Sequence, residues 1–204
     1  ILSMLHLPED KLAAVTGGAV FEDGLGEFSA VREELRKYYP EDVRIKKIAA
    51  RAAKMAQSGQ YNYGRCMRRG DTVAAMLALD EFVRQAISMV YLLNRTYMPY
   101  YKWMFRGMEK FQILPEVAEK IRELSVMGDT SEMWKPPFPP GWNPYVNQLD
   151  PRVGRIEEIC QAVVGELRKQ GLTDSRDAFL EAHTWEIMKR IQDPELKKCH
   201  VMEG

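Results

Sequence analysis

Prolines and glycines divide this sequence into segments of helical length, within which apolar residues recur every three to four positions. Proline suits the first turn of a helix and glycine the position after its end, so this punctuation predicts where helices begin and stop. Five prolines stand at such starts: Pro8, Pro40, Pro99, Pro115 and Pro151. Ser58-Gly59 is predicted to interrupt the helix that starts at Pro40. The fold class predicted is all-α, an antiparallel helical bundle, with a small N-terminal hairpin or a loop at an Asp-Gly turn within residues 19–28.

The longest apolar segment is predicted to be a central helix that begins after Asp71-Thr72, a pair suited to capping, and runs to about Asn94. It is apolar nearly all round, as expected of a helix surrounded by others. No run of 18 apolar residues occurs in the chain, so no membrane partner is expected. The three cysteines, Cys66, Cys160 and Cys199, are widely spaced, which favours reduced thiols and a cytoplasmic location.

Composition changes between residues 129 and 150, a segment with five prolines. Consecutive prolines exclude helix, so this segment is predicted to be an extended arm or connector. Its interleaved aromatic residues predict that it packs on another part of the molecule: Trp134, Phe138, Trp142 and Tyr145. We therefore divide the chain into a helical bundle (1–128), a proline-rich arm (129–150) and an additional helical pair packing on the bundle (151–204).

Charge is balanced overall, with 29 basic and 29 acidic residues, which argues against a globally basic nucleic-acid-binding protein. Locally it is not balanced, because residues 43–70 contain eight basic residues and no acidic one. The first members form a stripe on one helix face: Arg44, Lys47, Arg51 and Lys54. This stripe predicts a positive surface that attracts phosphate; the alternative is a solvated face paired with glutamates of neighbouring helices. Beside it, Arg65, Arg68 and Arg69 accompany Tyr61 and Tyr63, a combination suited to a base and its phosphates.

Aromatic side chains are concentrated in residues 94–103, where they form either a ligand-binding wall or bundle core with polar tips. On the preceding helix, Glu81 and Arg84 are one turn apart, which indicates an ion pair or a carboxylate at a cleft. Motifs of phosphate loops, dinucleotide-binding folds, zinc proteases and serine hydrolases do not occur. Arg176 and His183 have the spacing of the HEPN class of helical ribonucleases, although a histidine packed in the core is the alternative. No metal site is expected.

Several blocks occur in an order typical of one family: 7–21, 38–43, 65–71 and 82–103, the last with Leu-Leu-Asn followed by Tyr-x-Pro-Tyr-Tyr-Lys-Trp. Over residues 3–125 the chain resembles the helical C-terminal half of bacterial nucleotidyltransferase-like proteins, a half classed as a domain of unknown function. The layout is similar to that of kanamycin nucleotidyltransferase. In such proteins an N-terminal domain supplies Gly-Ser and an Asp-x-Asp pair that holds Mg²⁺ on a nucleoside triphosphate, and the helical half closes the cleft.

Neither Gly-Ser nor Asp-x-Asp occurs in this chain. The resemblance therefore implies that a nucleotidyltransferase-like domain precedes it as a missing partner, or that activity has been lost. It implies cleft-lining roles for the positions that match the family: Arg65, Arg69, Asp71, Arg84, Tyr97, Tyr101, Lys102 and Trp103. The charge pattern adds Glu81 to these candidates.

The function predicted is a helical accessory domain that positions a nucleotide or acceptor and is not catalytic alone. Mg²⁺ and a nucleoside triphosphate are expected only in the parent protein. The alternative is a protein-interaction or dimerisation module, whose partner is another protein or a second copy, and a third hypothesis is a HEPN-type ribonuclease acting on RNA.

Overall fold

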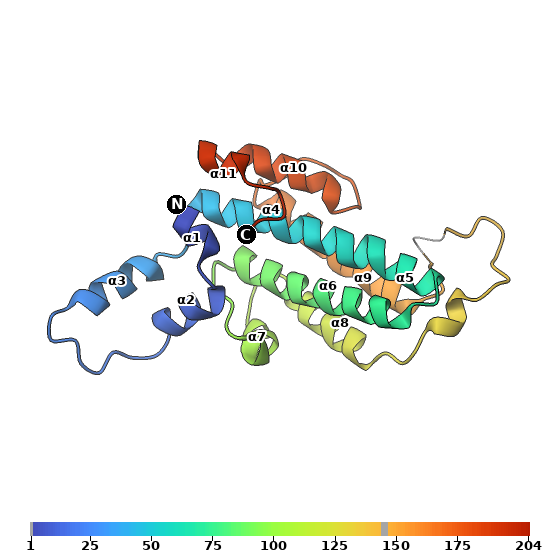
Figure 1. The fold of residues 1–204 in the computed structure, drawn as a ribbon, viewed down its shortest axis with the longest axis horizontal. Coiled ribbons are helices and arrows are strands. Elements are labelled where there is room, and N and C mark those ends of the chain that lie inside the picture. Colours follow the sequence, from blue (N-terminus) through green and yellow to red (C-terminus); the bar gives the residue numbers. More distant parts are fainter. Residues whose placement is uncertain (1, 144–146) are drawn as a thin grey trace.

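A computed structural model describes residues 2–143 and 147–204, and every regular element in that part of the chain is helical. The α-helices are α1 (Leu2–His6), α2 (Glu9–Thr16), α3 (Glu27–Arg36), α4 (Glu41–Met55), α5 (Gly64–Arg68), α6 (Thr72–Leu93), α7 (Tyr101–Met108), α8 (Pro115–Val126), α9 (Pro151–Lys169), α10 (Glu181–Arg190) and α11 (Pro194–Lys198). A π-helix, η1 (Ala56–Tyr63), and a 3-10 helix, η2 (Ser131–Trp134), complete the elements. The all-α prediction is confirmed (Figure 1). Within the described residues, none of the helices is long and apolar enough to cross a bilayer.

Helix α4, η1 and α5 follow one another without a break and run antiparallel to α6 (Figure 1). The break expected at Ser58-Gly59 is wrong, and one local and one distant contact support the continuous helix. The Ser58 hydroxyl donates to the carbonyl of Lys54 at 2.6 Å, and Gly59 lies directly against the buried ring of Phe82. The π-helix η1 therefore occupies the position at which the sequence predicted that the helix would be interrupted.

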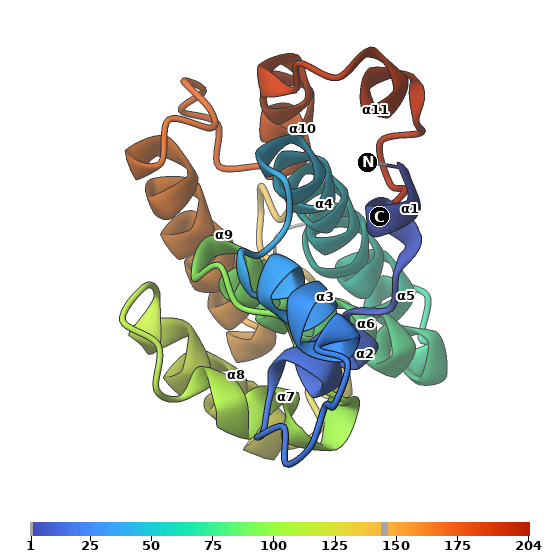
Figure 2. The ribbon, with the colours of Figure 1, turned by 90° about the vertical axis from the view of Figure 1, so that its left-hand side faces the viewer.

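Helices α9 and α10 complete the bundle around this pair, as the end-on view shows (Figure 2). A single buried cluster includes Ile48 of α4, Ile87 of α6, Ile159 of α9 and Ile187 of α10. Residues 151–204 therefore share one core with the N-terminal helices. Apolar burial across these helices is the main stabilising contribution to the bundle.

Of the hairpin and the loop that the sequence allowed within residues 19–28, the structure has the loop. Phe21, which would have packed on such a hairpin, is 98% exposed, and an isolated two-stranded hairpin with no apolar cover is only marginally stable. Asp23 organises a turn instead: its carbonyl accepts from the backbone N–H of Gly26 at 3.0 Å and its carboxylate from that of Ser29 at 2.7 Å. Those hydrogen bonds lead directly into α3.

The proline-rich segment is fastened to the bundle by its aromatic residues. Trp134 is buried, and its indole N–H donates to the Asp150 carboxylate at 2.8 Å. The same carboxylate accepts from the hydroxyl of Tyr63 at 2.9 Å, which ties the segment to η1. Phe138 stacks on Trp142 with ring centroids 3.8 Å apart. The predicted packing on another part of the molecule is confirmed for Trp134 and for Trp142, which packs against the core and under Arg68 of α5. The stacking partner of Phe138 belongs to the segment itself, and Tyr145 lies outside the described residues.

Helix α6 is buried along only part of its length. Its C-terminal half, from Gln85 to Leu93, is buried throughout, as expected of a central helix. Near its N-terminus the side chains of Val73, Met76 and Leu77 are 63%, 61% and 62% exposed. The expectation of burial nearly all round is therefore wrong for the first turns, because no described element covers that face.

Candidate functional site

A cavity of about 370 Å³ lies where α2, α4, α6 and the start of α7 meet. It brings together Arg84 and Tyr101, which the sequence singled out, with Arg51 of the basic stripe. The other residues that line it are acidic, aromatic or apolar: Glu9, Asp10, Met98, Pro99, Tyr100 and Met104. A few convergent charges within aromatic and apolar walls are typical of small-molecule sites. We refer to these nine residues as the arginine–aromatic cavity.

The aromatic wall is positioned by the start of α7. Tyr100 precedes the helix, and its carbonyl accepts from the backbone N–H of Trp103 at 2.8 Å. The hydroxyl of Tyr91 on α6 donates to the carbonyl of Met104 at 2.8 Å and holds α7 against the bundle. The rings of Tyr100 and Tyr101 then lie 4.5 Å apart, both largely exposed, at the edge of the cavity. Exposed tyrosine faces of this kind can stack on a planar ligand.

Arg51 is the buried cation of the cavity, and each of its three guanidinium nitrogens forms a hydrogen bond. It donates to the hydroxyl of Ser88 at 2.7 Å, to Glu9 at 3.1 Å and to the main-chain oxygen of Gly204 at 2.5 Å. Glu9 also lies 3.5 Å from the ammonium of Lys47. Burial lowers the pKa of Lys47, and the charge of Glu9 opposes that effect. One carboxylate thus holds two buried cations beside the cavity.

Arg84 is the least committed cation of the cavity. Its guanidinium is 3.8 Å from Asp80 and 4.0 Å from Glu81, distances at the limit of an ion pair, and its side chain is exposed. Exposed pairs of this length contribute little. Glu81 is itself occupied by a hydrogen bond from the side-chain amide of Gln85 at 2.7 Å. Arg84 is therefore free to turn toward an anion in the cavity.

The basic stripe of α4 is not a positive surface over most of its length. Arg44, Lys46, Lys47 and Arg51 are buried, and only Lys54 is partly exposed. The positive surface expected from Arg44, Lys47 and Arg51 is therefore wrong. The alternative of pairing with a glutamate of a neighbouring helix is correct for Lys47 and Arg51, through Glu9 of α2, although these pairs are buried and not solvated. Arg44 pairs instead with Glu41 of α4 itself, whose side chain is half exposed. Oxygen acceptors around each cation make that burial tolerable.

Tyr97 is separated from the cavity by its own contacts. Its ring packs 4.8 Å from that of Tyr38 and 4.9 Å from that of Tyr39, and its hydroxyl donates to the carbonyl of Leu35 at 2.9 Å. Burial raises the pKa of Tyr97 to about 12. Its contacts are those of a residue that fixes α3 to the bundle.

Arg65, Arg69 and Asp71 lie at the opposite end of α6. Asp71 caps that helix, accepting from the backbone N–H of Ala74 at 3.0 Å. The guanidinium of Arg65 lies over the ring of Tyr61, 4.6 Å from its centroid, and Arg69 is exposed. Thirteen residues of helix separate Asp71 from Arg84, roughly 20 Å. This group therefore cannot line the same cavity as Arg84.

Lys102 and Trp103 are exposed on α7 and do not line the cavity, although each is adjacent in sequence to residues that do. Glu9 and Tyr100, which line it, were not predicted. Both belong to sequence blocks that carry the family resemblance, which is the signal that could have found them.

The pair Arg176 and His183 does not share a helix face. Arg176 lies before the start of α10, whereas His183 is fully buried within it. One ring nitrogen of His183 is 2.9 Å from the Thr173 hydroxyl and the other 2.8 Å from the carbonyl of Asp177. The histidine is packed in the core, and the expected one-face geometry is wrong.

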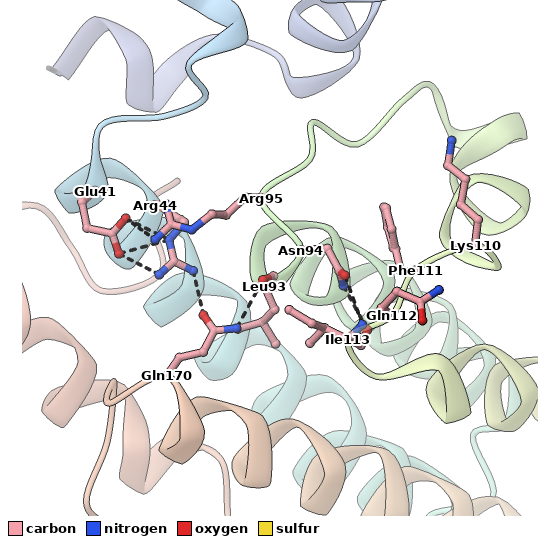
Figure 3. Close-up of a pocket in the computed structure, with 10 residues that line it drawn as sticks. All are labelled: Glu41, Arg44, Leu93, Asn94, Arg95, Lys110, Phe111, Gln112, Ile113 and Gln170. Atoms are coloured by element: carbon pink, nitrogen blue, oxygen red, sulfur yellow. Dashed lines mark hydrogen bonds and ion pairs between the residues drawn. The ribbon is translucent and has the colours of Figure 1, made fainter.

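A larger cavity, of about 620 Å³, opens at the end of the bundle beside Asn94 and Gln170 (Figure 3). Two of its three basic residues share its one carboxylate, because Glu41 bonds Arg44 at 2.7 Å and Arg95 at 2.9 Å; Lys110 is the third. Burial would raise the pKa of Glu41, but these two guanidinium groups outweigh burial and lower it. None of the residues singled out as site residues lines this cavity.

No group of three or more metal-binding side chains comes together among residues 2–143 and 147–204. Glu9 and Asp10 are the acidic residues of the arginine–aromatic cavity, and Glu9 is engaged by two cations. These residues do not fit a Mg²⁺ site.

Residues 4–104 match the model of a family described as Domain of unknown function (DUF4037). No curated protein and no solved structure matches the chain. All nine residues of the arginine–aromatic cavity fall within the matched segment, whereas the larger cavity extends to residues outside it, such as Lys110 and Gln170.

Proposed function

We propose that this chain is the helical accessory domain of a nucleotidyltransferase-like protein and that its arginine–aromatic cavity positions a nucleotide or its acceptor. The observation that supports this most directly is the meeting of Arg84, Tyr101 and Arg51 around one cavity. A guanidinium group suits phosphate and a tyrosine face suits a base, so the cavity offers both parts of a nucleotide a partner.

In this proposal, chemistry belongs to the parent protein. Metal-assisted transfer needs clustered carboxylates, and the described residues contain no such cluster. An upstream domain would hold Mg²⁺ and the reacting phosphate, and this chain would complete the cleft. Purified alone with Mg²⁺ and labelled nucleotide, it should transfer no label, and the gene should encode Gly-Ser and Asp-x-Asp upstream.

Equilibrium titration with ATP tests the cavity. Arg84→Glu should weaken binding about tenfold or more, since a hydrogen bond to a charged group contributes on the order of 1.5–3 kcal/mol. Tyr101→Ala should weaken it about fivefold or more, since stacking of a base on an aromatic ring contributes on the order of 1–3 kcal/mol. Arg69→Glu is the matched control, because Arg69 is an exposed arginine at the other end of α6. If Arg69→Glu abolishes binding and Arg84→Glu does not, the anion site is at α5 and this assignment is wrong.

A second candidate function, a protein-interaction or dimerisation module, is favoured by the exposed apolar face of α6. Val73, Met76 and Leu77 form that face, and exposed apolar groups at helical spacing are typical of surfaces that bind another protein. Light scattering would test self-association: a dimer that dissociates on Met76→Glu would support this function, and a monomer at all concentrations would exclude dimerisation.

A further inference from the structure

The segment from His200 to Gly204 crosses the basic side of α4, and its main-chain oxygens accept hydrogen bonds from the basic side chains of that helix. The ammonium of Lys46, which is 0% exposed, donates to the carbonyl oxygens of His200 at 2.8 Å, Val201 at 3.2 Å and Glu203 at 2.5 Å. All three acceptors belong to one short stretch of backbone. The segment therefore fills the position where a ligand of Lys46 would lie.

Two more cations of α4 reach the end of the same segment. The main-chain oxygen of Gly204 accepts from Arg51 at 2.5 Å and lies 3.5 Å from the ammonium of Lys54. The Gly204 backbone also lies close to Leu5 and Lys47, so a side chain at that position would crowd them. We refer to Lys46, Arg51 and Lys54 as the covered cation cluster.

One ion pair, between Glu9 and Arg51, is formed by the covered cation cluster among the described residues. Glu9 is shared between Lys47 and Arg51, and among the described residues no carboxylate lies within ion-pair distance of Lys46 or Lys54. Carbonyl oxygens carry only partial charge, so they stabilise the buried ammonium groups incompletely. Burial accordingly lowers the pKa of both Lys46 and Lys54. An arrangement of this kind favours a stronger anion.

The segment that covers the cluster is held loosely by side chains. Residues 201–204 are each partly exposed, and the ion pair between His6 and Glu203, at 3.4 Å, is at the surface. Its bonds to the cluster come from backbone oxygens, which any chain could provide. Phosphate oxygens carry full charge and form hydrogen bonds with lysine and arginine about twice as strong as neutral ones.

We propose that the covered cation cluster is a binding site for a polyphosphate and that residues 200–204 occupy it as an internal competitor. Arg51 belongs both to the cluster and to the arginine–aromatic cavity, so a triphosphate on α4 would extend toward Tyr101. Assigning that triphosphate to a nucleotide rests on the proposed function; the anion site itself does not.

Calorimetric titration with inorganic triphosphate tests the site. A variant lacking residues 200–204 should bind at least tenfold more tightly than the full chain, and Lys54→Gln in that variant should remove most of the gain. Lys37→Gln, at an exposed lysine of the same chain, is the control and should change nothing. Equal affinity with and without the segment would overturn the proposal.

A measurement on the full chain avoids dependence on the shortened variant. Saturating triphosphate should displace the segment, so amide hydrogen exchange at residues 201–204 should become faster. Binding that leaves this exchange unchanged, or slows it, would overturn the proposal even if the shortened variant failed to fold.

The two proposals can fail separately. If ATP binding depends on Tyr101 and Arg84 while triphosphate binding ignores the segment, the cavity function stands and the covered site is wrong. If triphosphate binds the shortened variant through Lys54 while Tyr101→Ala leaves ATP binding unchanged, the covered site stands and the cavity function is wrong.

Discussion

Helices α4 and α6 lie side by side in the bundle, and the more charged of the two is the more completely buried (Figure 1). Every residue of α4 from Val43 to Ala53 is buried, including four lysines and arginines. Helix α6 is far more apolar, yet it leaves Val73, Met76 and Leu77 exposed. Burial of these two helices therefore depends on what surrounds them and not on how apolar they are. Oxygen acceptors and other helices surround α4, whereas no described element covers the first turns of α6.

Removing the carboxylate of Glu9, which pairs with two cations of α4, should give the largest loss of stability. Glu9→Gln would leave the buried Lys47 and Arg51 without their shared carboxylate, and breaking a buried pair in this way costs about 3–5 kcal/mol of unfolding free energy. Urea denaturation measures it. Glu34→Gln, in an exposed pair with Lys37, should cost less than about 1 kcal/mol. Equal losses in the two variants would mean that the α4 cations are solvated.

Truncating apolar residues on the two halves of α6 should give unequal losses. Ile87→Ala empties a buried position and should lower the unfolding free energy by about 2–5 kcal/mol. Leu77→Ala, at an exposed position of the same helix, should change the unfolding free energy by less than about 0.5 kcal/mol relative to the unsubstituted chain. A large loss from Leu77→Ala would show that a partner or a second copy covers this face in solution.

The close contact between η1 and α6 should make Gly59 hard to replace. In Gly59→Ala the added methyl group would overlap the ring of Phe82, and such overpacking typically costs about 1–3 kcal/mol. Gly165→Ala in α9 is the matched control, because nothing lies within 4 Å of the new methyl group. It should stabilise the protein by about 0.5–1 kcal/mol through helix propensity. If both substitutions stabilise, α4 and α6 are less closely packed at η1.

The smallest effect at neutral pH is expected for Lys46→Met, because relief from burying a charge offsets the lost hydrogen bonds. Burial lowers the pKa of Lys46 to about 8 from its ordinary value of 10.5. Between those values the unfolded chain binds more protons than the folded one, so the contribution of Lys46 to stability rises with pH. The unsubstituted chain should therefore gain stability relative to Lys46→Met from pH 8 to pH 10.5, and denaturant midpoints across that range measure this gain. A constant difference would contradict a buried ammonium.

Local signals in the sequence located most helix starts. Pro115 and Pro151 open α8 and α9, and Asp71 caps α6 as predicted. Local signals failed where a distant residue decided the outcome. Ser58-Gly59 was expected to end a helix, but the ring of Phe82 needs the space that Gly59 leaves, and η1 continues.

The candidate site was only partly accessible to sequence reasoning. Arg84 and Tyr101 were singled out and line one cavity, but Arg65 and Asp71 lie about 20 Å away at the other end of α6. Helical spacing places residues on a face without saying which neighbour that face meets. The pairing of Glu9 with Arg51, 42 positions apart, required the tertiary structure.

The sequence alone predicted that this chain is helical and where most of its helices begin, because proline, glycine and capping residues act through neighbouring backbone atoms. It also determined that α4 would carry a basic face. That this face is turned inward against Glu9 and residues 200–204 follows from the tertiary structure alone. Those acceptors come from segments far apart in the chain, and an ion pair or hydrogen bond between them has no local signature that the spacing of residues could display.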